Sequence, residues 1–236
     1  MASTRRHRIP EIILITITVA IVALLLVTTF DTSHHAGPNT NAKHNLKQIG
    51  LAMHSYLSTN LTFPAQAIRG KNGKPLLSWR VALLPYFEQG TVDEYLFGRF
   101  RLDEPWNSPH NLKLLDSMPE VYRSPRNPET GRTRCLGVVG EKTLFGDMHG
   151  ASDQDITDGL SNTILVVEAD YSVAWTKPED LDYDATIPLN GLGHAHPSEF
   201  NVLLSDGSVR FILDNIDKDV LRGLMTINGG EDVRVP

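Results

Sequence analysis

The chain has 236 residues, of which 41% are hydrophobic, 21% charged and 7% aromatic, a composition typical of a folded protein and not of a disordered one. Its formal net charge is −6 at pH 7. This charge argues against nucleic acid as a partner, because a nucleic-acid-binding protein needs a basic surface that neutralises phosphates. Cys135 is the only cysteine, which excludes an intramolecular disulfide.

The first predicted element is an uncharged, apolar run of 19 residues from Ile12 to Phe30. As a helix it would be about 28 Å long, close to the thickness of the hydrocarbon core of a bilayer. Three arginines within residues 1–11 precede the run, and only Asp31 follows it closely. By the positive-inside rule, residues 1–11 are expected in the cytoplasm and everything after Phe30 outside it.

Two other interpretations of this run are a cleaved signal peptide and a buried helix of a soluble protein. The apolar region of a signal peptide usually has about 7 to 15 residues and ends at a small-residue cleavage site. The run is longer than that, and residues 28–31 (TTFD) contain no such site. We therefore expect a single-pass transmembrane helix at 12–30, in contact with membrane lipid, and a domain in the periplasm or at the cell surface.

The exported part is expected to begin with a linker at residues 31–40, which contains Gly37 and Pro38. Apolar residues then recur at spacings of three and four between Asn41 and Ser58, which predicts an amphipathic helix with its apolar stripe on a core. Residues 41–236 are expected to form one domain, since their number lies within the usual range for a single core.

The elements that follow are short. Asn72–Gly73 predicts a hairpin turn over residues 71–74. Short helical segments, interrupted at Pro85 and Gly90, are expected at 78–89 and 91–97, and another from Ser108–Pro109 to just before Pro119.

Strands predominate in the second half. The segment 205–208 (SDGS) predicts a tight hairpin, and a last helix is expected at 217–227 behind an Asp cap. Helices before strands indicate an α+β fold with an antiparallel sheet. Strands are predicted at 121–123, 135–139, 164–168, 200–204 and 209–213.

Candidate metal ligands lie in an acidic segment. Asp153, Asp155 and Asp158 resemble a calcium loop, but Gly159 falls one position too late for an EF-hand, which needs glycine at position 6. Another oxygen site for Ca²⁺ remains an alternative to a plain turn at Asp158–Gly159. His194 and His196 would share one face of a strand, but their spacing supplies no third metal ligand, and hydrogen-bonded loop histidines are the favoured interpretation.

No motif indicates catalysis. The chain contains no nucleophile elbow, zinc-protease helix motif, dinucleotide fingerprint or C-x-x-C pair. Trp79, Trp106 and Trp175 could stack on sugars, although packing in or beside a core is the commoner use of tryptophan.

Several separate segments together resemble one family. The clearest is His196 followed after nine residues by Asp206–Gly207, the H-X9-DG signature. The chain resembles domain-of-unknown-function family 1559, bacterial prepilin-like proteins related to type II secretion pseudopilins. The other matching segments are 45–54 (NLKQIGLAMH), 78–80 with 85–86, 102–111 (LDEPWNSPHN), 155–159 (DITDG) with 161–163 (SNT), and 175–181 (WTKPEDL).

The resemblance implies a pilin-like α+β fold, in which an N-terminal transmembrane helix and an amphipathic helix pack on an antiparallel sheet closed by the C-terminal hairpin. It implies that His196 and Asp206 are structural, with the histidine at the start of a strand meeting the turn at its end. Major pseudopilins carry a Ca²⁺ site, and a solute-binding role has been suggested for the family. The remaining signature residues, also expected to be structural, are Gly207, Asp158, Gly159 and Trp106.

One feature departs from the pseudopilin pattern. Prepilin cleavage requires a glycine ahead of the apolar run, whereas no glycine occurs here before Gly37. We therefore expect an uncleaved anchor. The function expected is that of a membrane-anchored, pseudopilin-like structural or assembly protein of the cell envelope, without catalysis, whose partners are other envelope or secretion-type proteins. The alternative is a tethered extracytoplasmic binding module for a solute or Ca²⁺.

Overall fold

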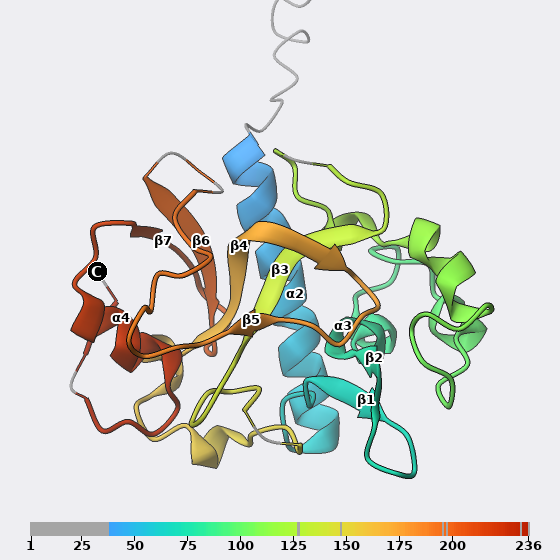
Figure 1. Cartoon of the computed structure of the whole chain (residues 1–236), viewed down its shortest axis with the longest axis horizontal. Helices are drawn as coiled ribbons and strands as arrows, with labels where there is room; N and C mark the ends of the chain where they lie inside the picture. The colour runs from blue at the N-terminus through green and yellow to red at the C-terminus, as the bar shows by residue number, and fades with distance from the viewer. Residues whose placement is uncertain are drawn as a thin grey trace, which may run out of the picture. The chain divides into compact units, whose positions relative to one another are not determined.

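The computed structural model describes residues 38–126, 128–146, 148–194, 196, 198–231 and 233–235, and it has an α+β fold (Figure 1). The expected membrane segment at 12–30 and residues 31–37 of the expected linker lie outside these ranges. Within them, no helix combines the length and apolarity needed to cross a bilayer. The helices are α2 (Pro38–Asn60), α3 (Trp79–Ala82) and α4 (Lys218–Met225), and the strands are β1 (Ala67–Arg69), β2 (Pro75–Ser78), β3 (Arg132–Val139), β4 (Ile164–Ala174), β5 (Leu181–Asp182), β6 (Glu199–Leu204) and β7 (Val209–Leu213).

Helix α2 is the amphipathic helix predicted at 41–58, extended at both ends. It begins at Pro38, so the last three residues of the expected linker belong to it. Proline is tolerated in a first turn because the N–H it lacks would have no partner within the helix. Leu46, Ile49 and Met53 are at most 1% exposed and carry the predicted apolar stripe into the main core.

The main sheet has the strand order β5-β3-β4-β6-β7 among the described residues. Four of these strands pair antiparallel, as expected, but β5 pairs parallel to β3. The sheet is therefore mixed, and the prediction of an antiparallel sheet was wrong at this edge. The chain leaving β4 returns along the far side of β3, where Leu181 is paired with Val138 and is buried in the core. A two-residue strand carries too little periodicity to be detected in the sequence.

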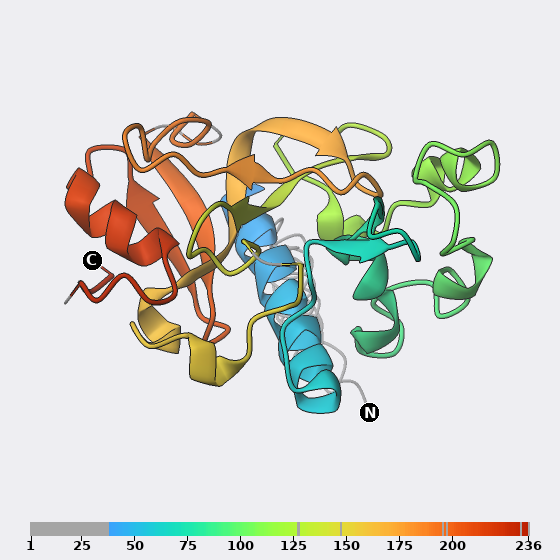
Figure 2. The same cartoon turned by 60° about the horizontal axis from the view of Figure 1, so that its bottom comes forward.

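Alternation along β6 and β7 supplies both faces of the sheet with apolar side chains. Leu203 and Val209 join the core beneath α2, whereas Val202 and Ile212 join a second cluster that contains Leu221 of α4. Figure 2 shows the β6–β7 pair between α4 and α2. Because both faces of the sheet are covered, side chains from β3 and β4 are buried on both sides.

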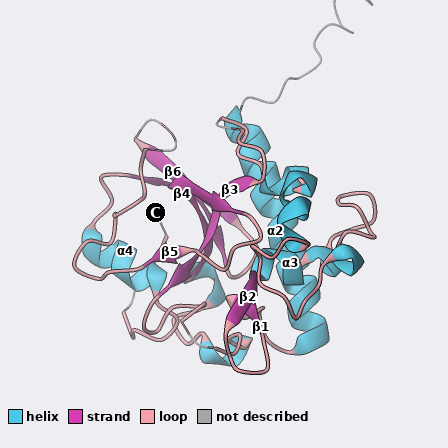
Figure 3. Cartoon of the chain, turned by 45° about the vertical axis from the view of Figure 1, so that its right-hand side comes forward, coloured by secondary structure: helices cyan, strands magenta, loops and turns pink. Residues whose placement is uncertain are grey.

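The chain between α3 and β3 differs most from expectation. The helical segment expected at 78–89, with its interruption at Pro85, consists of α3 and one turn of 3-10 helix that contains Pro85, so it is shorter than expected. The strand expected at 121–123 is a 3-10 turn whose Tyr122 is buried. Figure 3 shows this region as loops and short helical turns. The turns are η1 (Leu84–Tyr86), η2 (Phe97–Arg99), η3 (Asn111–Ser117) and η4 (Glu120–Tyr122), and two further ones, η5 (Asp153–Asp155) and η6 (Leu160–Asn162), precede β4.

The predicted hairpins are confirmed. β1 and β2 pair around the turn at 71–74, and β6 and β7 pair around 205–208, where Gly207 has the positive φ of 79° that a tight turn requires. Asp217 caps α4 as predicted, accepting hydrogen bonds from the backbone of Asp219 and Val220. β4 is longer than the predicted strand at 164–168 because its second half pairs with the start of β3.

Candidate functional site

A buried ion pair joins two of the signature segments. Arg80 of α3 and Asp180, the residue before β5, lie 2.5 Å apart, and both side chains are 0% exposed. The same carboxylate oxygen accepts hydrogen bonds from the Trp79 indole at 3.0 Å and from the Gly137 backbone at 2.9 Å. Asp180 thereby ties α3, β3 and β5 together. Both charged residues lie in segments that resemble the family, but their pairing could not be predicted from the sequence.

The surroundings of this pair are those of a core. Arg80 also donates to the carbonyl of Cys135 at 3.0 Å and to the hydroxyl of Ser78 at 2.6 Å. Burial raises the pKa of Asp180, although the adjacent guanidinium opposes that shift. Both side chains are fully buried and bonded to the chain itself, so the geometry of this pair is suited to holding elements together.

His196 forms a second buried polar cluster. Its Nε2 lies 2.7 Å from a carboxylate oxygen of Glu168 on β4, and the amide of Asn201 on β6 donates to the same oxygen at 2.8 Å. Ser124 donates to the other carboxylate oxygen at 3.2 Å. The cluster therefore fixes the chain before β6 to the centre of the sheet, which is a structural role for the signature histidine.

The partner expected for His196 is not the one observed. His196 precedes β6 and Asp206 follows it, and the six residues of β6 span about 20 Å of extended chain. Asp206 instead accepts a hydrogen bond from the backbone of Ser208 within its own turn, and the carbonyl of Gly207 accepts one from Lys47 of α2 at 2.8 Å. The two signature elements thus act at opposite ends of the same strand.

His194 has its own carboxylate partner. Its Nδ1 lies 2.8 Å from Asp170, and its side chain is 87% exposed, in contrast to buried His196. The two imidazoles therefore do not face a common ligand. The hydrogen bond with Asp170 and the charge of that carboxylate raise the pKa of His194 above its usual 6.5.

The candidate calcium ligands bind the protein itself. Asp155 accepts hydrogen bonds from the backbone and the hydroxyl of Ser152 at 2.8 and 2.7 Å, forming a capping box. Asp158 accepts from the backbone amides of Gly229 and Gly230 at 2.7 and 3.1 Å. Asp153 is exposed. In the described ranges, no group of three or more His, Cys, Asp or Glu side chains is arranged to hold a metal ion.

The remaining signature residues are also placed within the fold. Gly159 has a φ of 95° directly after Asp158, so the Asp–Gly pair forms a turn that only glycine adopts without strain. The Trp106 backbone donates to the carbonyl of Leu76, and the Lys177 ammonium lies 5.7 Å from the centre of its ring. Trp79 and Trp175 are 0% exposed in the aromatic core and so cannot stack on a sugar.

Cys135 is not positioned as a nucleophile. Its side chain is buried on β3, and burial raises the pKa of its thiol to about 12. A thiol with this pKa is protonated near neutral pH, and the thiolate is the reactive form.

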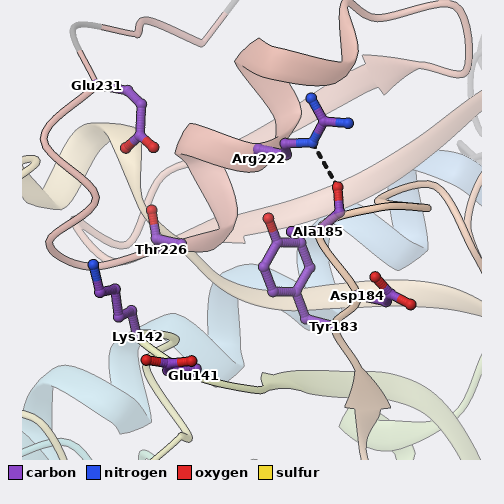
Figure 4. A pocket seen from close by; sticks show the side chains of 8 residues that line it. All are labelled: Glu141, Lys142, Tyr183, Asp184, Ala185, Arg222, Thr226 and Glu231. Carbon is purple, nitrogen blue, oxygen red and sulfur yellow. Dashed lines mark hydrogen bonds between the residues drawn. The ribbon is translucent and has the colours of Figure 1, made fainter.

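A polar hollow of about 630 Å³ lies where the chain leaves β3 and β5 (Figure 4). Glu141 and Lys142 follow β3, Tyr183 follows β5, and Arg222 comes from α4. Arg222 is fixed by a hydrogen bond of 2.6 Å from its Nε to the carbonyl of Ala185, which Figure 4 marks with a dashed line. Its guanidinium also pairs with Asp219 on the same helix. This hollow could not be predicted from the sequence, because its walls come from segments that are distant in the chain.

The hollow offers hydrogen-bonding groups of both charges. Lys142 and Glu141 make no ion pair with any residue that the structure describes. Partial burial raises the pKa of Tyr183, so its hydroxyl stays protonated and able to donate. Such a surface can contact a small polar solute with several functional groups.

Comparison with known proteins identifies one family. The family described as "Protein of unknown function (DUF1559)" matches residues 39–143 and 173–219. Neither the curated proteins nor the solved structures contain a match to the chain. The matched segments include both residues of the buried ion pair, His196 and Asp206, whereas Asp153, Asp155 and Asp158 lie between them.

Proposed function

The chain belongs to the DUF1559 family, and on that premise we propose that it is a membrane-anchored, pseudopilin-like structural protein of the cell envelope. Residues 12–30 serve as an uncleaved anchor, and the domain from Pro38 onward contacts other envelope proteins outside the cytoplasm. The observation that carries the proposal is the order of elements. An apolar run of membrane-spanning length is followed within eight residues by a long amphipathic helix that covers one face of a sheet.

The use of the polar signature residues supports a scaffold. Arg80 and Asp180 hold α3 and β5 to the sheet, and His196 holds the start of β6 through Glu168. Residues that are buried and bonded to the protein's own chain are not available to a substrate. A sequence motif built from them therefore specifies a fold, with recognition left to the exposed surface.

Topology can be tested with the native cysteine left in place. Cys135 is buried, so a membrane-impermeant maleimide should label only a cysteine introduced at an exposed site such as Lys71 in the β1–β2 turn. We expect labelling of Lys71→Cys in intact cells, and labelling of Ser3→Cys only after the membrane is opened. The reverse pattern would exclude an exported domain.

The assembly role has a separate test. A photo-crosslinking residue at Tyr95, which is 81% exposed, should trap a discrete protein partner in intact membranes, whereas the same residue at buried Leu96 should not. If maleimide labelling placed the domain outside the cytoplasm but no exposed site gave a crosslinked partner, the membrane anchor would still be supported and the assembly role would be refuted.

The hollow in Figure 4 favours a second candidate, a tethered module that binds a polar solute. A thermal-shift screen of the full chain in mild detergent with amino acids and sugars would test it, because a ligand that binds only the native state raises its stability. A stabilisation that Tyr183→Phe reduces would support binding at this hollow. A stabilisation left unchanged by Tyr183→Phe and by Lys142→Ala would exclude the hollow as its source.

A further inference from the structure

A second hollow, of about 520 Å³, lies between η2 and η3 and has a different electrostatic character. The charged or titratable side chains that line it are Arg99, Arg101, Lys113 and His110, and no acidic residue is among the lining residues. Three permanent positive charges therefore surround one hollow in a chain whose net charge is −6. This is the opposite of what the overall charge leads one to expect.

The backbone behind these cations is fixed. Asn111 is 0% exposed, accepts a hydrogen bond from the backbone of Arg101 at 3.0 Å, and donates to three carbonyls of the loop at 101–105. Phe100 is buried and lies edge-on to Trp175, with 5.7 Å between ring centres. Asn111 belongs to the signature segment 102–111, so this wall is built by residues that the family resemblance had singled out. A preformed wall lowers the entropy lost when a ligand binds.

The cations retain donors for a ligand. Arg101 pairs with Glu104 at 2.9 Å and Arg99 lies 3.7 Å from Asp93, but the two arginine side chains are 58% and 50% exposed. A guanidinium has five N–H donors, and one carboxylate contact leaves most of them free. Lys113 makes no ion pair within the described part of the chain.

His110 is oriented toward the same hollow by its neighbour. Its Nε2 lies 2.8 Å from the carbonyl of Arg99, and because a carbonyl can only accept, this nitrogen carries the proton. That contact fixes the imidazole ring against the loop that carries Arg99 and Arg101. Three cations and an oriented imidazole thus line one side of the molecule within a short stretch of chain.

We propose that this hollow binds the phosphate group of a ligand, as a free ester or as a lipid head group. Arginine forks match phosphate geometry, and Lys113 adds a point charge. Glu104 and Asp93 partly offset the charge of the two arginines, but Lys113 is unpaired in the described ranges, and a dianion at this hollow interacts more strongly with all three cations than a single carboxylate does. The inference does not depend on the assembly role, since a structural protein can also carry an anion site.

The test uses the full chain in mild detergent and calorimetric titration with inorganic phosphate at constant ionic strength. The double variant Arg99→Ala/Lys113→Ala should weaken binding about tenfold or more, since each lost charge-assisted contact reduces affinity severalfold. The control Lys218→Ala/Arg234→Ala removes the same two residue types from other exposed positions and should change affinity less than about twofold. Acetate should bind at least about tenfold more weakly than phosphate.

Three results would overturn the proposal: no phosphate binding by the wild type, equal losses in the two double variants, or equal affinity for acetate. All four substituted side chains are exposed, so unfolding temperatures should stay close to that of the wild type and a loss of binding cannot be attributed to misfolding. Parallel titrations with glycerol phosphate and with phosphatidic acid in the micelles, which are both phosphomonoesters, distinguish the source of the phosphate, and the tighter of the two identifies it.

Discussion

Replacing Asp180 with alanine should destabilise the protein more than any surface charge substitution. The change leaves the Arg80 guanidinium fully buried without its counter-ion, and it removes the acceptor of the Trp79 indole and the Gly137 amide. Breaking a buried pair in this way costs about 3–5 kcal/mol. For a chain of this size, 1 kcal/mol corresponds to about 2–4 °C, so the unfolding temperature should fall by about 6–20 °C.

Thermal unfolding of the full chain in mild detergent, followed by the fluorescence of the buried tryptophans, measures this change. The matched control is Glu179→Ala, which breaks the exposed pair between Lys177 and Glu179 one position earlier and should cost less than about 1 kcal/mol. The double variant Arg80→Met/Asp180→Leu should recover part of the loss, because it leaves no buried charge unpaired although the Trp79 indole and the Gly137 amide still lack an acceptor. If Asp180→Ala and Glu179→Ala lowered the unfolding temperature equally, Asp180 would not be holding α3, β3 and β5 together.

Three further predictions concern single residues. The pKa of His194 is raised by Asp170, so this pair should stabilise the folded protein fully below pH 6.5, and the stabilisation should be lost as the pH rises through the pKa of the folded state. NMR titration of the ring measures the direction of the pKa shift. Unfolding temperatures of the wild type and of His194→Gln, compared across pH, measure the stabilisation. Cys135 should resist alkylation at pH 8 until the chain is unfolded in denaturant, and rapid alkylation of the native protein would contradict its burial. Asp158→Ala should cost about 1–2 kcal/mol through the loss of two backbone contacts, whereas Asp153→Ala should cost less than about 0.5, as thermal unfolding of the two variants would show.

Elements specified by local pattern could be predicted from the sequence. The apolar spacing of α2 and the Asp–Gly turn between β6 and β7 place both elements within a few residues of their observed bounds. Each signal lies within one contiguous stretch and depends on a single preference, for an amphipathic helix or for a positive φ.

Elements specified by tertiary contacts could not be predicted from the sequence. Val121 is β-branched and suggested a strand, but the chain between Pro119 and Pro125 is short and Tyr122 is drawn into the core beside Trp79. β5 exists because Asp180 and Leu181 are held against β3. In both cases packing against distant residues overrides the local preference.

The same distinction applies to the candidate sites. The signature at His196 was visible in the sequence, but its partner Glu168 lies 28 residues earlier on another strand. The cationic hollow draws on residues between Gly98 and Leu114, whose shared surface depends on how η2 and η3 fold back on each other. Residue type could suggest polar function at these positions, whereas only the folded backbone brings the side chains together.

The contact between Lys47 and Gly207 links the first described helix to the last hairpin across 160 residues of sequence. The apolar stripe of α2 packs against η1 and η4 as well as against β6 and β7. Part of the stripe therefore lacks its partners until β6 and β7 have been synthesised, and the nascent chain exposes apolar surface until then. Folds dominated by such distant pairings form slowly and are exposed to aggregation in the meantime. A chain truncated before Glu199 should therefore depend on chaperones, and this requirement would shape how the cell handles the protein before it reaches its final location.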